Sequence, residues 1–188
     1  MNILYLHGYK SDKNAYKARQ LQQLRPQHRI ICHTLRYEEL PPEEIQQEIR
    51  QYVADEEVDI IVGSSFGGYH ALCASLWFEG PVWCINPVCQ AAHCIQMLRA
   101  CTLLHCLPAR LAYSGDAGRM HTYYKRFDKQ VFDQIPQRDG QLHFLLSTDD
   151  ELLGSHRKIP RRFPKGDFQW FDKAGHTFCR LDDARLDF

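Results

Sequence analysis

Short apolar runs alternate with longer amphipathic segments along most of the chain. Six of these runs have the length and composition of strands, and they cover residues 2–6, 29–35, 58–62, 82–85, 141–147 and 168–171. The runs are largely apolar rather than strictly alternating, which is typical of strands buried on both faces of a parallel sheet. The segments between them have helical spacing, as at Ile45, Ile49 and Val53. The pattern predicts an α/β fold of about six mostly parallel strands, with helices on both faces and right-handed crossovers.

Local signals predict where some of the helices begin. Ser11 and Asp12 are suited to cap a helix that continues through Leu21. Residues 41–44 open a second helix, because proline is tolerated in a first turn and acidic side chains favour the positive end of the helix dipole. A last short helix is expected to begin near Thr177.

Residues 88–140 interrupt this alternation. They lie between the fourth and fifth expected strands and form a stretch far longer than one crossover helix requires. We interpret them as a helical insertion. The chain of 188 residues suits one compact domain, so we expect a single domain over residues 1–188 that carries this insertion.

Charge and hydropathy exclude some classes of partner. The 23 Lys and Arg residues balance 23 Asp and Glu residues, so no net charge favours a nucleic-acid partner. The one basic run, Arg157 to Arg162, has acids on both sides and is interpreted as a solvated loop rather than a phosphate site. No apolar run reaches the ~20 residues of a membrane span.

Eight cysteines are a high count for this length. Met1 and Asn2 lead directly into an apolar run without the basic segment of a secretory signal peptide, so we expect a cytoplasmic protein with reduced thiols. Cys94, Cys101 and His105 would share one helix face at spacings that zinc can use. The chain contains no C-x-x-C pair and the same spacing describes a buried stripe, so no metal site is predicted.

Residues 63–67 read Gly-Ser-Ser-Phe-Gly and match the pattern G-x-S-x-G. The match directly follows an apolar run and precedes a helical segment, which is the setting of a nucleophile elbow. Side chains at Gly63 and Gly67 would collide with the neighbouring strand and helix, and the helix that begins at Phe66 directs its positive end at the site. The alternative is that Ser65 only caps that helix. The context favours Ser65 as a nucleophile.

A serine hydroxyl needs a base to take its proton, and the base needs a third group to orient it. His176 lies after the last expected strand, where an α/β-hydrolase carries its base. Taken alone, it would be interpreted as a loop histidine bonded to backbone. The loop after the fifth expected strand offers two acids, Asp149 and Asp150. The order nucleophile, acid, base agrees with this fold.

Negative charge develops on the substrate oxygen during acyl transfer, and preorganised donors must stabilise it. The Phe66 amide, directly after the nucleophile, would supply one donor. Residues 6–9 follow the first strand and are placed to supply another from the Tyr9 amide. His7 in the same loop is interpreted as structural, because backbone rather than imidazole serves there.

Five motifs lie at residues 6–9, 63–69, 86–87, 148–151 and 175–176. In this order, and over nearly the whole chain, they resemble the YqiA-like bacterial esterases of the UPF0227 group. The resemblance implies a minimal α/β-hydrolase that cleaves carboxylic esters or acyl thioesters without a metal or organic cofactor. The family's acid has a Gly-Asp-Glu context, which corresponds to Asp150, with Asp149 in place of the glycine and as the alternative acid.

The sequence therefore predicts a serine hydrolase that acts on a small-molecule acyl ester or thioester through an acyl-enzyme. The triad would be Ser65, His176 and Asp150. The same triad would serve an acyltransferase or a peptidase, and the scaffold would also suit a non-catalytic binding module. The sequence does not specify an oligomeric state.

Two interpretations of the insertion stay open and are compatible with each other. Its apolar residues would form a lid over Ser65 that removes apolar substrate from water, or they would pack the insertion against the sheet. These residues are Leu98, Leu103, Leu104, Leu107, Tyr123, Tyr124 and Phe127.

Overall fold

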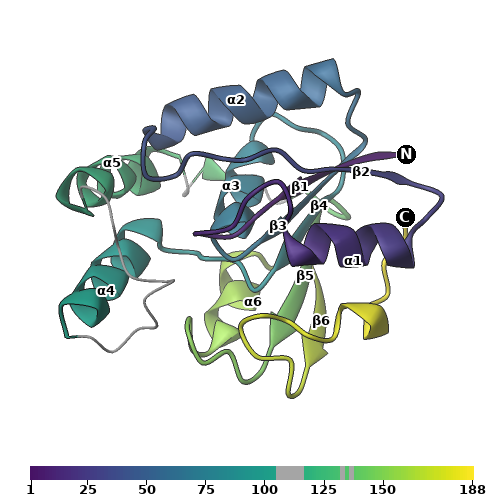
Figure 1. The fold of residues 1–188 in the computed structure, drawn as a ribbon. Helices are drawn as coiled ribbons and strands as arrows, with labels where there is room; N and C mark the ends of the chain where they lie inside the picture. The colour runs from purple at the N-terminus through teal and green to yellow at the C-terminus, as the bar shows by residue number, and fades with distance from the viewer. Residues whose placement is uncertain (105–116, 132–133, 136–137) are drawn as a thin grey trace.

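The computed structural model describes residues 1–104, 117–131, 134–135 and 138–188. In this part of the chain six strands form one sheet in the order β2-β1-β3-β4-β5-β6, and all neighbouring pairs are parallel (Figure 1). The strands are β1 (Asn2–Leu6), β2 (Arg29–Ile31), β3 (Ile60–Ser64), β4 (Val82–Ile85), β5 (Leu142–Ser147) and β6 (Asp167–Phe171). The expected number and direction of strands are confirmed.

The helices of the described residues cover the sheet. They are α1 (Tyr16–Leu24), α2 (Pro42–Asp55), α3 (Phe66–Ala74), α4 (Ala91–Leu103), α5 (Ala117–Gln130) and α6 (Ile159–Arg162), with 3₁₀ helices at His156–Lys158 and Leu181–Asp183. As expected, α2 begins with a proline followed by Glu43 and Glu44. None of the described helices is both long and apolar enough to cross a membrane.

Successive strand residues face two separate apolar cores. Leu4 and Leu6 of β1 belong to the core beneath α2, α3 and the insertion helices. Ile3 and Tyr5 belong to the core beneath α1 and the C-terminal segment. All four residues are at most 1% exposed. A strand buried on both faces must be apolar at successive positions, which explains the missing alternation and confirms helices on both faces.

Strand β2 ends earlier than expected. The apolar run was expected to be extended through Leu35, whereas pairing with β1 stops at Ile31. Beyond that point the chain passes the loop after β1, and the Leu35 N–H donates to His7 Nε2 at 2.9 Å. A side-chain acceptor therefore replaces the sheet partner.

Two expected helix starts are wrong. Helix α1 begins at Tyr16 without a side-chain cap, because Asp12 Oδ1 accepts the Asn14 N–H at 2.7 Å and closes a local turn instead. The last short helix does not begin near Thr177. Phe178 has a φ of 51° and the Cys179 N–H bonds back to Ala174, so regular helix is first found at Leu181–Asp183.

The insertion is helical, and α4 and α5 pack against each other. Leu98, Tyr124 and Phe127 are buried in the main core, so these residues pack the insertion onto the domain. Leu103 and Leu104 are more than 70% exposed and Tyr123 is 38% exposed. Leu107 lies outside the described residues. A lid over Ser65 stays a prediction.

The zinc-compatible spacing in the insertion, from which no metal site was predicted, lies partly outside the described residues. Within them, no group of three His, Cys, Asp or Glu side chains is arranged to hold a metal ion. His105 lies outside the described ranges. Cys94 is buried in the core beside Leu98, as an ordinary apolar stripe requires.

A buried polar network connects α2, α3 and α5. Gln46 Oε1 accepts the Trp77 indole N–H at 3.2 Å, so the Gln46 amide nitrogen is the atom that donates to His70 Nδ1 at 3.0 Å. His70 Nε2 then carries the proton and donates to Tyr124 Oη at 2.7 Å. Beside it, Tyr69 Oη donates to Asp128 at 2.6 Å. The helix that follows Ser65 is thereby fixed to the insertion.

Acid is expected to destabilise the fold through His70. Burial lowers the pKa of His70 to about 3, whereas an unfolded histidine takes up its proton near 6.5. The stability that depends on a neutral His70 is therefore complete above pH 6.5 and is lost as the pH falls toward 3. The loss amounts to ~1.4 kcal/mol for each pH unit in this window.

Urea unfolding at several pH values between about 7 and about 4 measures this loss. His70→Gln should weaken the pH dependence. His143→Gln is the matched control, since His143 of β5 stacks on Trp83 and its side chain retains contact with solvent. Equal pH dependence in the parent and the His70 variant would contradict the prediction.

Candidate active site

The turn between β3 and α3 holds Ser65 in a strained conformation. Its φ of 54° and ψ of −117° are rare for a residue with a side chain, and such strain concentrates at functional sites. The Ser65 N–H donates to Ile85 at 2.9 Å, and its carbonyl accepts the Tyr69 and Val88 N–H groups. The side chain makes no capping bond to α3, so the alternative of a simple helix cap is not supported.

The elbow glycines permit close backbone approach. A Cβ at Gly63 would lie 2.4 Å from the Gly67 carbonyl oxygen, and one at Gly67 would lie 2.1 Å from the Leu6 carbonyl oxygen. Both separations are far below van der Waals contact. A side chain at either glycine would therefore collide with the neighbouring helix or strand, as expected from the sequence. The helix is α3, to which Gly67 belongs, and the strand is β1.

Three loops at one end of the sheet bring a hydroxyl, an imidazole and a carboxylate into one row. His176 Nε2 lies 3.0 Å from Ser65 Oγ. His176 Nδ1 lies 2.9 Å from Asp150 Oδ2 and 3.1 Å from Oδ1. Because a carboxylate only accepts, Nδ1 carries the proton, which leaves Nε2 to accept from the serine hydroxyl. The Asp150 side chain is fully buried and that of His176 is 15% exposed.

Asp150 and Asp149 have different surroundings. Asp150 contacts the imidazole, whereas Asp149 Oδ1 accepts the Ser147 hydroxyl at 2.6 Å and the Ala174 and Gly175 N–H groups at 3.1 and 3.2 Å. Asp150 thus faces the imidazole, and Asp149 holds the backbone of the loop that carries His176. Glu151 also holds this loop by accepting the His176 N–H at 2.8 Å.

Hydrogen bonds keep Asp150 ionised despite its burial. Burial alone would raise the pKa of this carboxyl, but hydrogen bonds from His156 and His176 outweigh it and hold the pKa well below its usual range. The backbone N–H groups of Leu152 and Leu153 donate to Oδ1 at 2.9 and 2.7 Å. The carboxylate is therefore negative at neutral pH and can stabilise a protonated imidazole.

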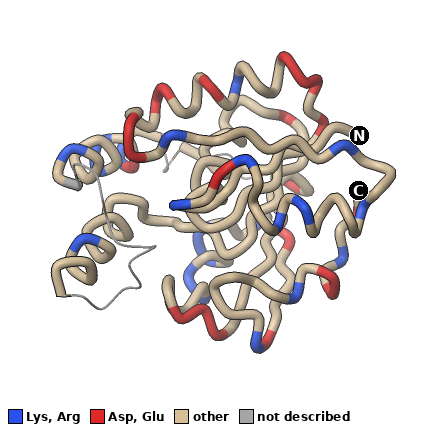
Figure 2. The backbone as a smooth tube through the Cα atoms, in the orientation of Figure 1, with Lys and Arg blue, Asp and Glu red and all other residues tan. Residues whose placement is uncertain are grey.

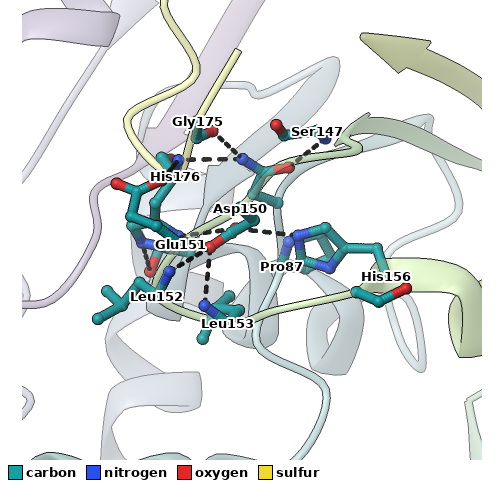
Figure 3. Close-up of polar contacts among 12 residues, drawn as sticks. Pro87, Ser147, Asp150, Glu151, Leu152, Leu153, His156, Gly175 and His176 are labelled. Atoms are coloured by element: carbon teal, nitrogen blue, oxygen red, sulfur yellow. Dashed lines mark hydrogen bonds and ion pairs between the residues drawn. The ribbon is translucent and has the colours of Figure 1, made fainter. Parts of the chain in front are cut away.

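Sequence analysis missed His156. Its Nε2 lies 2.9 Å from Asp150 Oδ2, on the side away from His176, so the acid lies between two imidazoles (Figure 3). The residue is 5% exposed and begins a 3₁₀ helix that is capped by Ser155. His156 directly precedes the basic run, and no motif links it to the acid six residues earlier.

Asn86 belongs to the motif at residues 86–87, for which the sequence predicted no role. It follows β4 with a φ of 42°. Its Oδ1 accepts the Ser147 N–H at 2.7 Å, and its Nδ2 donates to the carbonyls of Gly175 at 2.9 Å and His176 at 3.3 Å. One amide therefore connects the end of β5 to the histidine loop.

The loop after β1 passes beside Ser65. A Cβ at Gly8 would lie 3.4 Å from the Ser65 Cβ, and the Tyr9 ring packs edge-on against Phe66. The Phe66 N–H belongs to the first turn of α3, where no helical carbonyl is available to it. His7 is buried and bonds backbone through both ring nitrogens, at Gly8 and Leu35, which agrees with a structural role.

A family model places the chain among known sequences. The model, described as an uncharacterised protein family named UPF0227, matches residues 2–184. The chain belongs to the UPF0227 family. The match confirms the resemblance carried by the five motifs, and it spans all residues of this UPF0227 site. Comparison with curated proteins gave no match.

Solved structures share the fold of this UPF0227 member. Est1E from Butyrivibrio proteoclasticus has a TM-score of 0.70 at 12% identity, with 95% of this chain and 80% of that chain covered. The monoacylglycerol lipase of Paleococcus ferrophilus has a TM-score of 0.69 at 12% identity, with 93% and 85% covered. Mouse alpha/beta hydrolase domain-containing protein 10 has a TM-score of 0.64 at 16% identity, with 97% and 88% covered. These likenesses establish the α/β-hydrolase fold.

Proposed function

We propose that this UPF0227 protein is a serine hydrolase that cleaves carboxylic esters or acyl thioesters through an acyl-enzyme. The observation that carries the proposal is the hydrogen-bonded row from Ser65 through His176 to Asp150. The esterases and lipases among the structures of the same fold support it. Ser65, His176 and Asp150 would act as nucleophile, base and acid.

The first half of the reaction forms the acyl-enzyme. Ser65 Oγ attacks the substrate carbonyl carbon as its proton passes to His176 Nε2. Asp150 stabilises the resulting imidazolium through Nδ1. The Phe66 and Tyr9 amides would donate to the oxygen that becomes negative. His176 then gives its proton to the departing alcohol or thiol as the tetrahedral intermediate collapses.

Water completes the reaction by the same route. His176 Nε2 takes a proton from water, whose oxygen attacks the acyl carbon, and the acid product leaves as the proton returns to Ser65. An alcohol or amine in place of water would make the protein an acyltransferase. Product analysis with competing alcohols and amines separates these outcomes.

A fluorophosphonate probe tests the proposed function. The probe phosphonylates a serine whose hydroxyl is activated by a neighbouring base, so Ser65 should be labelled. Peptide mapping by mass spectrometry should locate the modification there, and acid-denatured protein serves as the unlabelled control. Native protein that leaves Ser65 unmodified would favour a binding module on the same scaffold.

His156 is expected to support the acid. Replacing it with phenylalanine removes a donor from Asp150 while keeping a ring of similar size. Loss of one hydrogen bond to a charged group should lower kcat by about 10- to 100-fold. The pKa of Asp150 should rise, since a contact that lowers it is gone.

Steady-state kcat for an activated ester at neutral pH, measured for the parent and for the His156→Phe protein, checks this prediction. His156→Asn retains a side-chain N–H and should recover part of the activity. His143→Phe is the control at a histidine remote from the acid, with its nearest polar side chain at Asp167. Parent-like kcat in the His156→Phe protein would show that His156 only fills space.

A further inference from the structure

A cavity of about 420 Å³ adjoins the proposed catalytic residues. One wall comes from the loop after β4 and the first half of α4, and the other comes from the segment between the acid and the end of α6. Cys94, Met97, Leu153 and Ile159 supply much of its apolar lining. Its volume lies within the usual range for small-molecule sites.

Two contacts join this cavity to the catalytic row. His156 lines the cavity and bonds Asp150 at 2.9 Å. Val88 also lines it, and the Val88 N–H donates to the Ser65 carbonyl at 3.0 Å. Figure 3 shows Pro87, another lining residue, on the His156 side of the acid. Residues that line the cavity therefore contact the backbone of the nucleophile and the side chain of the acid.

The fully charged side chains that line the cavity are all basic. Lys158 and Arg162 line the cavity, and its lining residues include no Asp or Glu. Figure 2 shows the basic residues of this segment in blue around α6. Both side chains are exposed, so the cations lie at the rim while apolar groups lie deeper. Burial raises the pKa of Asp128 of α5, and Arg162 is one of the groups that oppose this rise, so part of the Arg162 charge already acts on Asp128. Lys158 is therefore the cation chosen for substitution.

The basic run was interpreted as a solvated loop, but residues 157–162 belong to a 3₁₀ helix and to α6, so only the exposure of its charged side chains to solvent is confirmed. Arg157 and Arg161 are exposed and do not line the large cavity, in agreement with that interpretation. Lys158 and Arg162 are four residues apart, a spacing that places them on one face of the helical turns. Only this face borders the cavity.

We infer that the cavity binds a part of the substrate that is remote from the reacting carbonyl and ends in an anion. This inference rests on the proposed function and names its substrate class. An apolar linker of a few carbons would lie against Met97, Leu153 and Ile159, and a carboxylate at its end would meet Lys158 and Arg162. Such substrates are half-esters or thioesters of dicarboxylic acids, or esters of alcohols that carry a carboxylate.

Matched substrate pairs test the inference. For the acyl half, p-nitrophenyl hydrogen glutarate is compared with p-nitrophenyl pentanoate. For the alcohol half, 4-carboxybenzyl butanoate is compared with benzyl butanoate. At least one anionic member should have the higher kcat/KM of its pair, mainly through a lower KM, and the pair that shows this identifies the half that occupies the cavity.

Two variants of the basic segment make the test specific. Lys158→Gln should reduce the ratio of kcat/KM between anionic and neutral members by about 3- to 5-fold, the range of one partly exposed ion pair. Arg161→Gln is the matched control, because it removes an exposed cation from the same turn outside the cavity. The control should leave the ratio at its parent value.

The possible results separate this inference from the proposed function. Equal kcat/KM within both pairs, or equal ratios in the Lys158 and Arg161 variants, would overturn the inference, even with Ser65-dependent hydrolysis of the neutral esters. Hydrolysis of none of the four esters, together with an unlabelled Ser65, would overturn the proposed function and this inference with it.

Discussion

Replacing Ser65 with alanine is expected to lower ester hydrolysis by at least ~10³-fold without unfolding the protein. The hydroxyl is the atom that would form the acyl-enzyme, and water held by the remaining groups is a poor substitute. The fold should persist, since the strained turn is held by bonds from the Ser65 backbone to Ile85, Tyr69 and Val88, which alanine retains. Turnover of p-nitrophenyl esters and the thermal midpoint measure the two effects.

Ser64 provides the matched control for this experiment. It is the neighbouring serine, but its hydroxyl accepts from Tyr5 at 2.9 Å on the other side of the strand. Ser64→Ala should therefore cost some stability, about 1 kcal/mol for a lost buried hydrogen bond, and should keep most of the activity. Parent-like hydrolysis by the Ser65 variant would eliminate Ser65 as the nucleophile.

Asp150→Asn should reduce kcat by about 10⁴-fold, the loss seen in other serine hydrolases when an amide replaces the acid of the triad. An asparagine can donate to His176 Nδ1, which would move the imidazole proton to Nε2. The ring would then be unable to accept from Ser65. The amide also has no charge with which to stabilise the imidazolium. Single-turnover kinetics with an activated ester would measure the acylation step directly.

Asp149→Asn is the comparison that tests the choice between the two acids. Asp149 accepts from Ser147 and from the backbone of the histidine loop, so its loss should loosen the loop without changing the imidazole tautomer. We expect a smaller reduction, about 10-fold, together with a lower thermal midpoint. A larger effect at Asp149 than at Asp150 would reverse the assignment.

The sequence was informative wherever a local pattern has one physical cause. Apolar runs predict buried parallel strands. Gly63 and Gly67 predict an elbow because a side chain at either position would collide with the following helix or with the neighbouring strand β1. The positions of Ser65 and His176 followed from strand order. In each case the determining interaction is local or is imposed by the order of the strands.

The remaining parts of the site depend on contacts that no spacing encodes. Asp149 and Asp150 are adjacent in one turn, and only the path of the backbone determines which carboxylate faces His176. His156 reaches the acid from the first position of a 3₁₀ helix, so its contact with Asp150 depends on the path of the backbone between the two residues. The predicted start of α1 was wrong because Asp12 accepts the Asn14 N–H in a local turn and does not cap the helix.

Asn86 has a consequence for how this family can vary. Its amide sets the alignment of the acid-bearing and histidine-bearing loops, and it precedes residue 88, where the insertion begins. Alignment of the triad is therefore fixed upstream of the segment that builds one wall of the cavity. Changes in the length or composition of that segment are therefore expected to alter which substrates the proposed site accepts, while the row from Ser65 to Asp150 stays in place.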